Sequence, residues 1–230
     1  MIISIIIPCY NEEKTIKILL NRIFSIKLKK QIIIINDGST DKSKLIINSY
    51  KSKIDTIIHK KNNSGKGSCV ILAKKFIKGD VVIMQDADLE YDPKDYYKLI
   101  KPIKEKKTLV VYGSRVLNKN NYKNNNFIKA FRAFGNFVLT TISNFLNHQQ
   151  LTDAHTCYKV FAASLFKKIS LQEKDFSFCP EITTKLALMG IKIYEIPINY
   201  NGRSYKEGKK INFYDALKTL YTLIKYRFFL

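Results

Sequence analysis

Short apolar runs rich in β-branched residues alternate with helical stretches through the first half of the chain, and this alternation limits the fold most. The runs predicted as strands are 2–7, 32–35, 56–58, 81–84 and 109–112. The stretches with helical spacing are 12–25, 40–50, 67–77 and 93–106. Strands without polar interruption are typical of strands buried on both faces. The sequence therefore predicts an α/β fold with a mostly parallel central sheet flanked by helices.

The second half has a less regular pattern. Its helical stretches are 127–147, 180–190 and 213–229, and one further strand is predicted over 192–197. A loop rich in Lys and Asn spans 118–126, and a basic loop spans 202–210. We find no internal repeat and no stretch that reads as a linker, so we expect residues 1–230 to form a single domain.

A pair of carboxylates follows the fourth predicted strand. Asp86 and Asp88 are two residues apart, so they project on the same side of an extended chain. A magnesium-type cation needs only one or two carboxylates when ligand phosphates supply other oxygens. The pair therefore predicts a divalent-cation site, with a solvated turn as the alternative.

Polar clusters also follow the first two strands and open the third helix. Ligands of parallel sheets bind beyond the carboxyl ends of the strands. The cluster Pro8-Cys9-Tyr10-Asn11-Glu12 and the cluster from Asn36 to Asp41 could thus receive a base and a ribose, or could be capped turns. Between Asn63 and Gly67, glycines permit close backbone approach and Lys66 can meet a phosphate, although the Walker spacing is absent.

These motifs together carry a resemblance. The set Pro8-Cys9-Tyr10-Asn11-Glu12, Asn36-Asp37-Gly38-Ser39, Gly65-Lys66-Gly67 and Asp86-Ala87-Asp88-Leu89 resembles the family 2 glycosyltransferases of the A type, particularly the dolichol-phosphate mannosyltransferase-like branch. Gly113-Ser114-Arg115, segment 152–159 and segment 200–210 are similar to later motifs of that branch, so the resemblance covers nearly the whole chain.

The resemblance implies the GT-A nucleotide-diphospho-sugar transferase fold and an inverting hexosyltransferase that requires Mg²⁺ or Mn²⁺. The donor would be a UDP- or GDP-linked sugar and the acceptor a polyprenyl phosphate in cell envelope biosynthesis. The alternative is the same fold with a saccharide hydroxyl as acceptor, in cell-surface polysaccharide synthesis. Residues 1–115 would then form the nucleotide-sugar and metal half, 116–212 the acceptor half and 213–230 a C-terminal amphipathic helix.

The resemblance also implies roles for individual residues. Those expected to contact the nucleotide sugar are Pro8, Tyr10, Glu12, Asp37, Lys66, Asp86, Arg203 and Lys209. The metal would be held by Asp86 and Asp88, and the acceptor phosphate by Arg115 and Arg132. The expected catalytic residues are Asp88, Arg115 and Asp153, with Asp153 as the base if the acceptor is a hydroxyl. Glu90 stands where many members have Gln.

The charge of the chain narrows the choice of partner. It has 40 Lys and Arg against 19 Asp and Glu, and this formal charge of +21 attracts phosphorylated molecules and anionic lipid, although coding bias can also enrich lysine. Nucleic acid would suit the charge, but no recognition motif is present and the acidic pair argues against it. The four cysteines form no CxxC pair, which predicts neither a zinc site nor a disulfide framework.

The sequence predicts neither a signal peptide nor a transmembrane helix. The last helix carries apolar residues interleaved with Lys218, Lys225 and Arg227, so it is either an interfacial helix on anionic lipid or a helix packed on the domain. We therefore expect a cytoplasmic protein, peripherally associated with the cytoplasmic face of a membrane.

Overall fold

The computed structural model of the protein describes residues 1–118, 127–203 and 213–229. Within these ranges, only the backbone is described for residues 127–132 and 213. Within these residues the sheet has seven strands in the order β3-β2-β1-β4-β6-β5-β7. The strands are β1 (Ile3–Cys9), β2 (Lys30–Asn36), β3 (Thr56–His59), β4 (Val81–Met84), β5 (Val110–Ser114), β6 (Lys159–Ala162) and β7 (Tyr194–Pro197).

Helices cover both faces of this sheet. The α-helices are α1 (Ile16–Ser25), α2 (Ser43–Ser49), α3 (Lys66–Ala73), α4 (Tyr96–Lys104), α5 (Phe127–Asn147), α6 (Ala163–Lys168), α7 (Phe178–Leu188) and α8 (Phe213–Phe228). Short 3₁₀ turns extend three of them: η1 (Lys51–Lys53), η2 (Lys74–Phe76) and η3 (Pro93–Asp95). The predicted mostly parallel α/β sheet with flanking helices is confirmed.

The first four strands of the chain, β1 to β4, run in one direction. β1 pairs in parallel with β2 and β4, and β2 pairs in parallel with β3. β6 runs antiparallel to both β4 and β5, whereas β5 pairs in parallel with β7. The carboxyl ends of β1, β2, β3 and β4 therefore lie along a single edge, where polar residues follow each strand.

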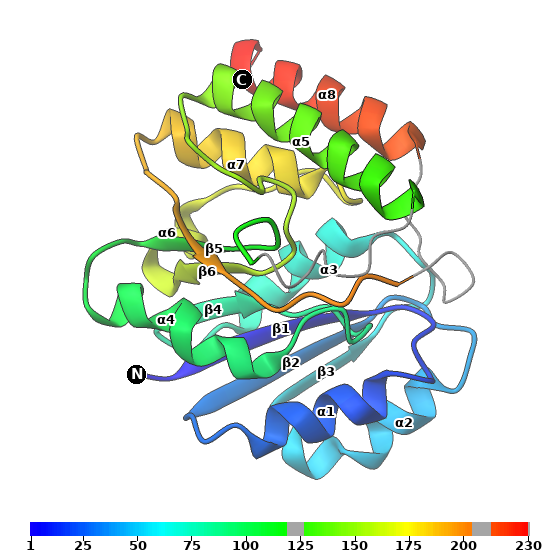
Figure 1. Ribbon diagram of the computed structural model, residues 1–230. Coiled ribbons are helices and arrows are strands. Elements are labelled where there is room, and N and C mark those ends of the chain that lie inside the picture. The colour runs from blue at the N-terminus through cyan, green and yellow to red at the C-terminus, as the bar shows by residue number, and fades with distance from the viewer. Residues whose placement is uncertain (119–126, 204–212, 230) are drawn as a thin grey trace.

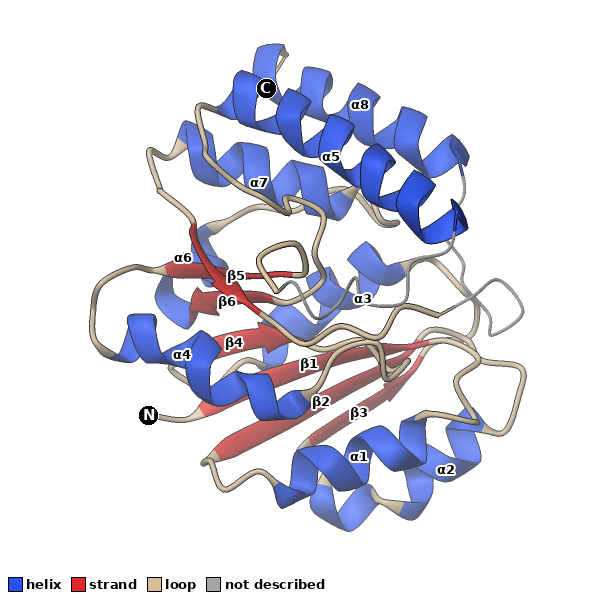
Figure 2. Ribbon diagram, in the orientation of Figure 1, coloured by secondary structure: helices blue, strands red, loops and turns tan. Residues whose placement is uncertain are grey.

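The apolar core has two parts, one on each face of the sheet (Figures 1 and 2). On one face, Ile5 of β1 packs with residues of α1, α2 and α4. On the other, Ile6 packs with residues of α3, α6 and α7. Successive residues of β1 face opposite cores, which is why Ile5, Ile6 and Ile7 follow one another without polar residues between them.

A third layer lies beyond α7. α5 and α8 run side by side on the far side of α7 from the sheet, and α7 contacts both (Figure 1). Ion pairs attach α8 to the segment before α7: Lys218 Nζ lies 3.0 Å from Asp175 Oδ2, and Lys225 Nζ lies 2.8 Å from Glu173 Oε1. The same segment also contacts α3, because the Ser68 N–H donates to the Lys174 carbonyl at 2.8 Å.

Two elements, β6 and α6, were not among the predictions. β6 begins at Lys159, whose ammonium is fully buried 3.5 Å from the centre of the Tyr112 ring and donates to the Ala154 carbonyl. A strand that opens with a buried Lys lacks the apolar pattern used to recognise the others. The predicted loops 118–126 and 202–210 lie almost entirely outside the described residues.

We expect Ile6→Ala to lower the free energy of unfolding by about 2–5 kcal/mol, because Ile6 is fully buried at the centre of the sheet. Ile18→Ala is the matched control: Ile18 is 45% exposed on α1 and should cost about 0.5 kcal/mol or less. Urea denaturation of both variants measures the difference. Equal losses would contradict the assigned core.

Candidate active site

A cavity of about 350 Å³ opens at the carboxyl edge of the parallel strands. Its walls come from the segments after β1, β2 and β4, from the start of α3 and from Phe176. Residues predicted from the sequence that line it are Pro8, Tyr10, Glu12, Asp37, Lys66, Asp86 and Asp88. Cys9, Asn63, Gly65, Cys69, Ala87 and Phe176 complete the lining and were not predicted as site residues.

Hydrogen bonds lock the turns after β1 and β2 to each other. Asn11 adopts a left-handed conformation at φ 53°, and its N–H donates to the Ser39 hydroxyl at 3.0 Å. Its side-chain oxygen accepts the Thr40 N–H at 2.9 Å, while the Glu12 N–H donates to Ser43 Oγ at 2.8 Å. The side chains of Tyr10 and Glu12 therefore project from a braced turn.

Asp37 organises the start of α3. Its two oxygens accept the backbone N–H groups of Ser64 and Gly65, and Lys60 pairs with the same carboxylate. Gly65 has φ +92°, and a Cβ there would lie 2.5 Å from the Lys174 carbonyl oxygen, so only glycine fits. This turn sets the first helical residue, Lys66, against the carboxylates after β4.

Four carboxylates and two cations meet beside the cavity. Lys66 pairs closely with Asp86. Arg203 lies 2.9 Å from an oxygen of Asp88 and 3.1 Å from one of Glu12, with Glu90 close by at 3.9 Å. At neutral pH the formal charges of these six described side chains sum to two negative charges.

The excess of negative charge changes the pKa values of these side chains. Burial, and then repulsion by Asp86 and Glu90, raises the pKa of Asp88 to about 7. Burial also disfavours the charged form of Asp86, but the Lys66 ammonium outweighs it and lowers the pKa of Asp86. Likewise the carboxylate of Asp86 raises the pKa of Lys66 in spite of its burial. Asp88 is thus the carboxylate least compensated by the protein.

The carboxylate oxygens at the cavity are ligands that suit a hard divalent cation. Within the part of the chain that the structure describes, no three His, Cys, Asp or Glu side chains are grouped as a ready metal site. A magnesium-type cation needs only one or two carboxylates when phosphates supply further oxygens. Asp86 and Asp88, at the cavity wall and with two negative charges in excess around them, fit that requirement.

A buried amide fixes the backbone at the acidic pair. The Gln85 Nε2 group donates to the Asp86 carbonyl at 2.9 Å. Its Oε1 accepts hydrogen bonds from the hydroxyls of Tyr96 and Tyr158, at 2.7 and 2.6 Å. Leu89 then turns the chain at φ 64°, a conformation that costs energy for a side chain of this size. Gln85 was missed from the sequence because it gives no signal beyond preceding Asp86.

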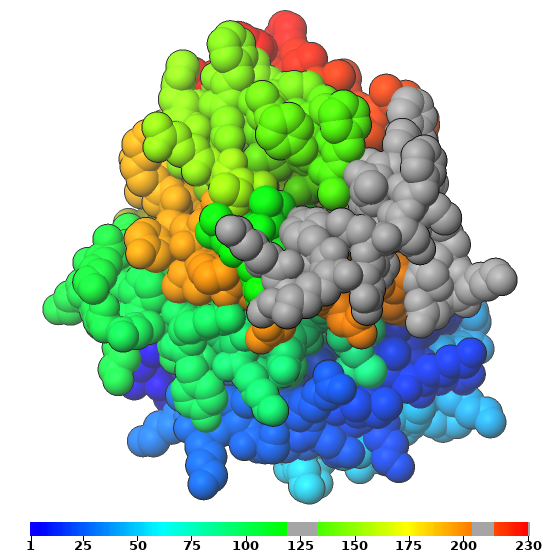
Figure 3. All heavy atoms as spheres, in the orientation of Figure 1, coloured from blue at the N-terminus to red at the C-terminus, as the bar shows by residue number. Residues whose placement is uncertain are grey.

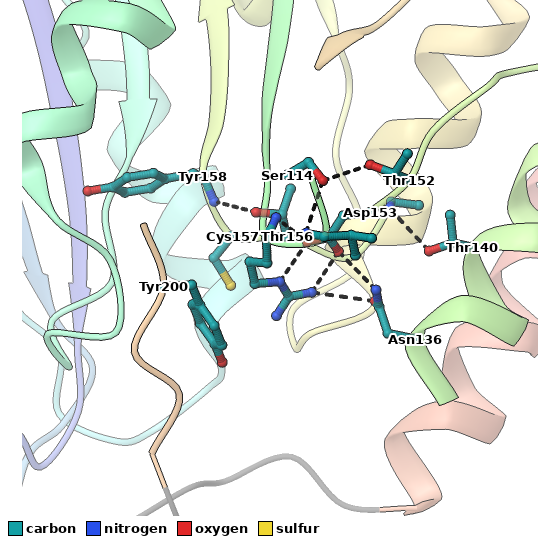
Figure 4. Close-up of polar contacts among 12 residues, drawn as sticks. Ser114, Asn136, Thr140, Thr152, Asp153, Thr156, Cys157, Tyr158 and Tyr200 are labelled. Carbon is teal, nitrogen blue, oxygen red and sulfur yellow. Dashed lines mark hydrogen bonds and ion pairs between the residues drawn. The ribbon is translucent and has the colours of Figure 1, made fainter. Parts of the chain in front are cut away.

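A second cluster is built around Arg115, and Figure 4 labels its members Asp153, Asn136 and Tyr200. The Arg115 guanidinium makes a two-pronged ion pair with Asp153, at 2.6 and 2.7 Å, and Asn136 of α5 donates to the same carboxylate at 3.2 Å. Its central carbon lies 5.2 Å from the centre of the Tyr200 ring. The structure therefore brings together Arg115 and Asp153, which are 38 residues apart in sequence.

Asp153 is held in its ionised form at full burial. Burial disfavours its charge, yet the Arg115 guanidinium outweighs this and lowers the pKa of Asp153 below its usual range. Both oxygens are engaged by Arg115 or Asn136. A carboxylate in this setting orients Arg115 and has no free oxygen directed at an acceptor hydroxyl.

Two predicted site residues cannot be compared with this geometry. Lys209 lies outside the described residues, and the side chain of Arg132, in the first turns of α5, is also outside them. Their predicted contacts with donor diphosphate and acceptor phosphate stay predictions.

Comparison with known proteins gives the class. The family model described as glycosyl transferase family 2 matches residues 4–170. The match covers more than half of the chain and includes the cavity-lining residues after β1, β2 and β4. The chain belongs to glycosyltransferase family 2.

Individual relatives are similar over nearly the full length. A UDP-N-acetylglucosamine–dolichyl-phosphate N-acetylglucosaminyltransferase of Methanococcus voltae is 29% identical, over 97% of this chain and 95% of the relative. A dolichyl-phosphate beta-glucosyltransferase of Trichomonas vaginalis is 28% identical, over 99% of this chain and 73% of the relative.

A solved structure supports the fold. Glucosyl-3-phosphoglycerate synthase from Mycobacterium tuberculosis, in complex with Mn²⁺, UDP and glucosyl-3-phosphoglycerate, superposes with a TM-score of 0.69. The match spans 98% of this chain and 79% of that one, at 16% sequence identity. The predicted GT-A fold is confirmed.

The raised pKa of Asp88 makes the stability of the protein depend on pH. The folded state holds a proton on Asp88 up to about pH 7, whereas the unfolded chain releases it near pH 4. The folded state therefore binds more protons over this interval, and the contribution of Asp88 to stability falls as pH rises from 4 to 7.

We expect Asp88→Asn to raise the melting temperature relative to the wild type by roughly 5 °C at pH 8, and by much less at pH 4. Thermal unfolding of both proteins across this range, in buffers without divalent cations, gives the measurement. A difference that does not grow with pH would contradict the assignment of Asp88 as the uncompensated carboxylate.

Proposed function

We propose that this glycosyltransferase moves a sugar from a nucleoside-diphosphate sugar to a polyprenyl phosphate, using Mg²⁺ or Mn²⁺ held by Asp86 and Asp88. The observation that carries the proposal is Arg115, a half-buried cation that the Asp153 carboxylate fixes through a two-pronged ion pair. The names of the relatives from Methanococcus voltae and Trichomonas vaginalis support the acceptor, since both proteins act on dolichyl phosphate.

The donor side follows from the cavity. Tyr10 and Asp37 lie at the wall where a nucleoside would bind, and Lys66 and Arg203 lie at the carboxylates where a diphosphate would meet the cation. A bound divalent cation neutralises charge that develops on the leaving diphosphate. Relatives and fold neighbours with UDP in their names favour a UDP-linked sugar, and GDP-linked donors are the second choice.

The reaction needs no proton transfer from the acceptor. A phosphate monoester has a second pKa of about 6, so its oxygen is already a nucleophile near neutral pH. That oxygen attacks the anomeric carbon, the bond from this carbon to the β-phosphate oxygen breaks, and its electron pair leaves with the nucleoside diphosphate. Attack opposite the leaving group inverts the anomeric configuration.

Arg115 orients the acceptor phosphate in this scheme. Guanidinium groups bind phosphate oxygens through paired N–H donors, and the ion pair with Asp153 fixes where these donors point. The role proposed for Asp153 is accordingly to position Arg115. Transfer to a saccharide hydroxyl would need a free base near the acceptor, and the contacts of Asp153 do not favour that alternative.

The exposed side chains of α5 and α8 suggest how the protein approaches a lipid acceptor. α8 exposes large apolar side chains three or four residues apart, namely Tyr214, Leu217, Tyr221, Ile224 and Phe228. α5 exposes Phe134, Phe137, Val138 and Phe145. In Figure 3, atoms of α5 form the upper part of the visible face and atoms of α8, which packs against α5, appear at its upper edge. We call these nine residues the aromatic face.

Several features favour a membrane surface as the partner of the aromatic face. Side chains such as Phe145 and Tyr221, exposed at 80% and 68%, gain free energy by entering the boundary between headgroups and acyl chains. The formal charge of +21 adds attraction to anionic lipid. α5 also supplies Asn136 to the Arg115 cluster, so this cluster lies next to the proposed membrane contact. None of the helices in the described part of the chain has the length and apolar character to cross a bilayer.

Turnover provides the first test. Purified protein is given UDP- and GDP-sugars with Mg²⁺ or Mn²⁺, with and without undecaprenyl or dolichyl phosphate in detergent, and release of nucleoside diphosphate is measured. We expect the lipid to stimulate release, and Asp86→Ala or Asp88→Ala to reduce the stimulated rate by two orders of magnitude or more.

The control for turnover is Glu105→Gln, which changes a carboxylate at the end of α4, far from the cavity, and should retain full activity. Stimulation by an oligosaccharide instead of the lipid would overturn the proposed acceptor. Full activity of both aspartate variants, or full activity in EDTA, would overturn the proposed cation site.

Vesicle binding tests the aromatic face. The double variant Phe137→Ser, Tyr221→Ser should bind vesicles containing anionic phospholipid about tenfold or more weakly than the wild type, because two large apolar side chains are lost. Leu45→Ser is the matched control, since Leu45 is 69% exposed on α2, at the opposite end of the molecule in Figure 1. Co-sedimentation gives the affinities. Equal weakening by both changes would contradict the surface assignment.

A further inference from the structure

Glu90 makes contacts that set it apart from the carboxylates of the cavity. It is absent from the cavity lining, although it lies two residues after Asp88. Its Oε2 accepts the hydroxyl hydrogen of Tyr200 at 2.9 Å, and its Oε1 accepts the backbone N–H of Arg203 at 2.8 Å. Its own carbonyl accepts the N–H of Asn201 at 2.9 Å. Glu90 therefore holds the chain from 200 to 203 at three points.

One of these contacts leads to the Arg115 cluster. The Tyr200 ring lies 5.2 Å from the central carbon of the Arg115 guanidinium and 5.3 Å from the Tyr91 ring. A cation over an aromatic face is attracted by the electrons of the ring. Because Glu90 fixes the Tyr200 hydroxyl, it also fixes the aromatic ring against which the Arg115 guanidinium lies.

Another contact leads to the donor carboxylates. The Arg203 backbone is bound to Glu90, while its guanidinium reaches Asp88 and Glu12 at 2.9 and 3.1 Å. The position of the backbone decides where this long side chain can reach. The carboxylate of Glu90 thus determines the placement of the cation beside the donor.

We propose that Glu90 is a positioning residue that orders both substrate-binding cations, Arg203 for the donor diphosphate and Arg115, through Tyr200, for the acceptor phosphate. The proposal rests on the proposed function for the identity of the two phosphates. It also explains the presence of Glu where a Gln is frequent, since two donors bind a carboxylate more strongly than an amide oxygen.

The proposal differs from a metal-ligand role for Glu90. Each oxygen of Glu90 already accepts a hydrogen bond, from Tyr200 or from Arg203, so a metal ligand would have to share one of these oxygens with the cation. A positioning residue instead acts on the two arginines whether or not a cation is bound. The two roles therefore predict different behaviour of the protein without metal.

The first experiment needs no substrate. Protein labelled with ¹⁵N-arginine is compared by NMR in the presence of EDTA, with the Nε signals of Arg115 and Arg203 assigned from single Arg→Lys variants. We expect Glu90→Gln to shift or broaden both signals and Tyr200→Phe to affect Arg115 alone. Glu105→Gln, the surface control, should leave both unchanged. If Glu90→Gln leaves both signals in place, the proposal is wrong, whatever the acceptor proves to be.

The second experiment uses the lipid-stimulated turnover. Loss of a hydrogen bond to a charged group corresponds to roughly tenfold in binding. We therefore expect Glu90→Gln to raise the KM for both donor and acceptor about tenfold with kcat changed less than threefold, and Tyr200→Phe to raise the acceptor KM alone. Loss of Mn²⁺ affinity with both KM values unchanged would overturn the proposal in favour of a metal ligand. Melting temperatures within a few degrees of the wild type verify folding.

Discussion

The common direction of β1, β2, β3 and β4 is the constraint on which the rest of the structure depends. Parallel strands must be connected by crossovers, so each strand ends at the same edge and the chain turns there before entering a helix. Hydrophobic burial on both faces fixes the register of these strands, and the register in turn fixes which residues follow them. Asp37 and Asp86 line the same cavity because β2 and β4, which precede them, both pair in parallel with β1.

The charges of the side chains at the carboxyl edge of the parallel strands determine which ligands can bind there. Burial brings carboxylates together at a cost, and the protein offsets part of it with Lys66 and Arg203 but leaves Asp88 incompletely compensated. The remaining negative charge is what a site for a cation and a diphosphate requires. In the Arg115 cluster the balance is different, because Arg115 and Asp153 neutralise each other. Because the net charge of this ion pair is small, its main effect is to fix the orientation of the Arg115 guanidinium.

The sequence allowed the sheet and most helices to be predicted, because uninterrupted Ile and Val runs and helical spacing are local signals. The long helix was predicted with the same bounds that α5 has. β6 was missed because its buried Lys159 is stabilised by distant partners. Cavity residues that follow strands were predicted for the same local reason, whereas Gln85, Phe176 and Tyr200 enter the two clusters only through contacts across the fold. Such contacts have no signature in a single sequence.

The segment from Glu173 to Phe176 gives the molecule an internal linkage between its outer and inner layers. Ion pairs join it to α8, its backbone is bound by Ser68 of α3 and touches Gly65, and Phe176 forms part of the cavity wall. A molecule that fills the cavity would contact the same wall to which the outermost helix is anchored. The segment therefore couples α8, and with it the aromatic face, mechanically to the cavity.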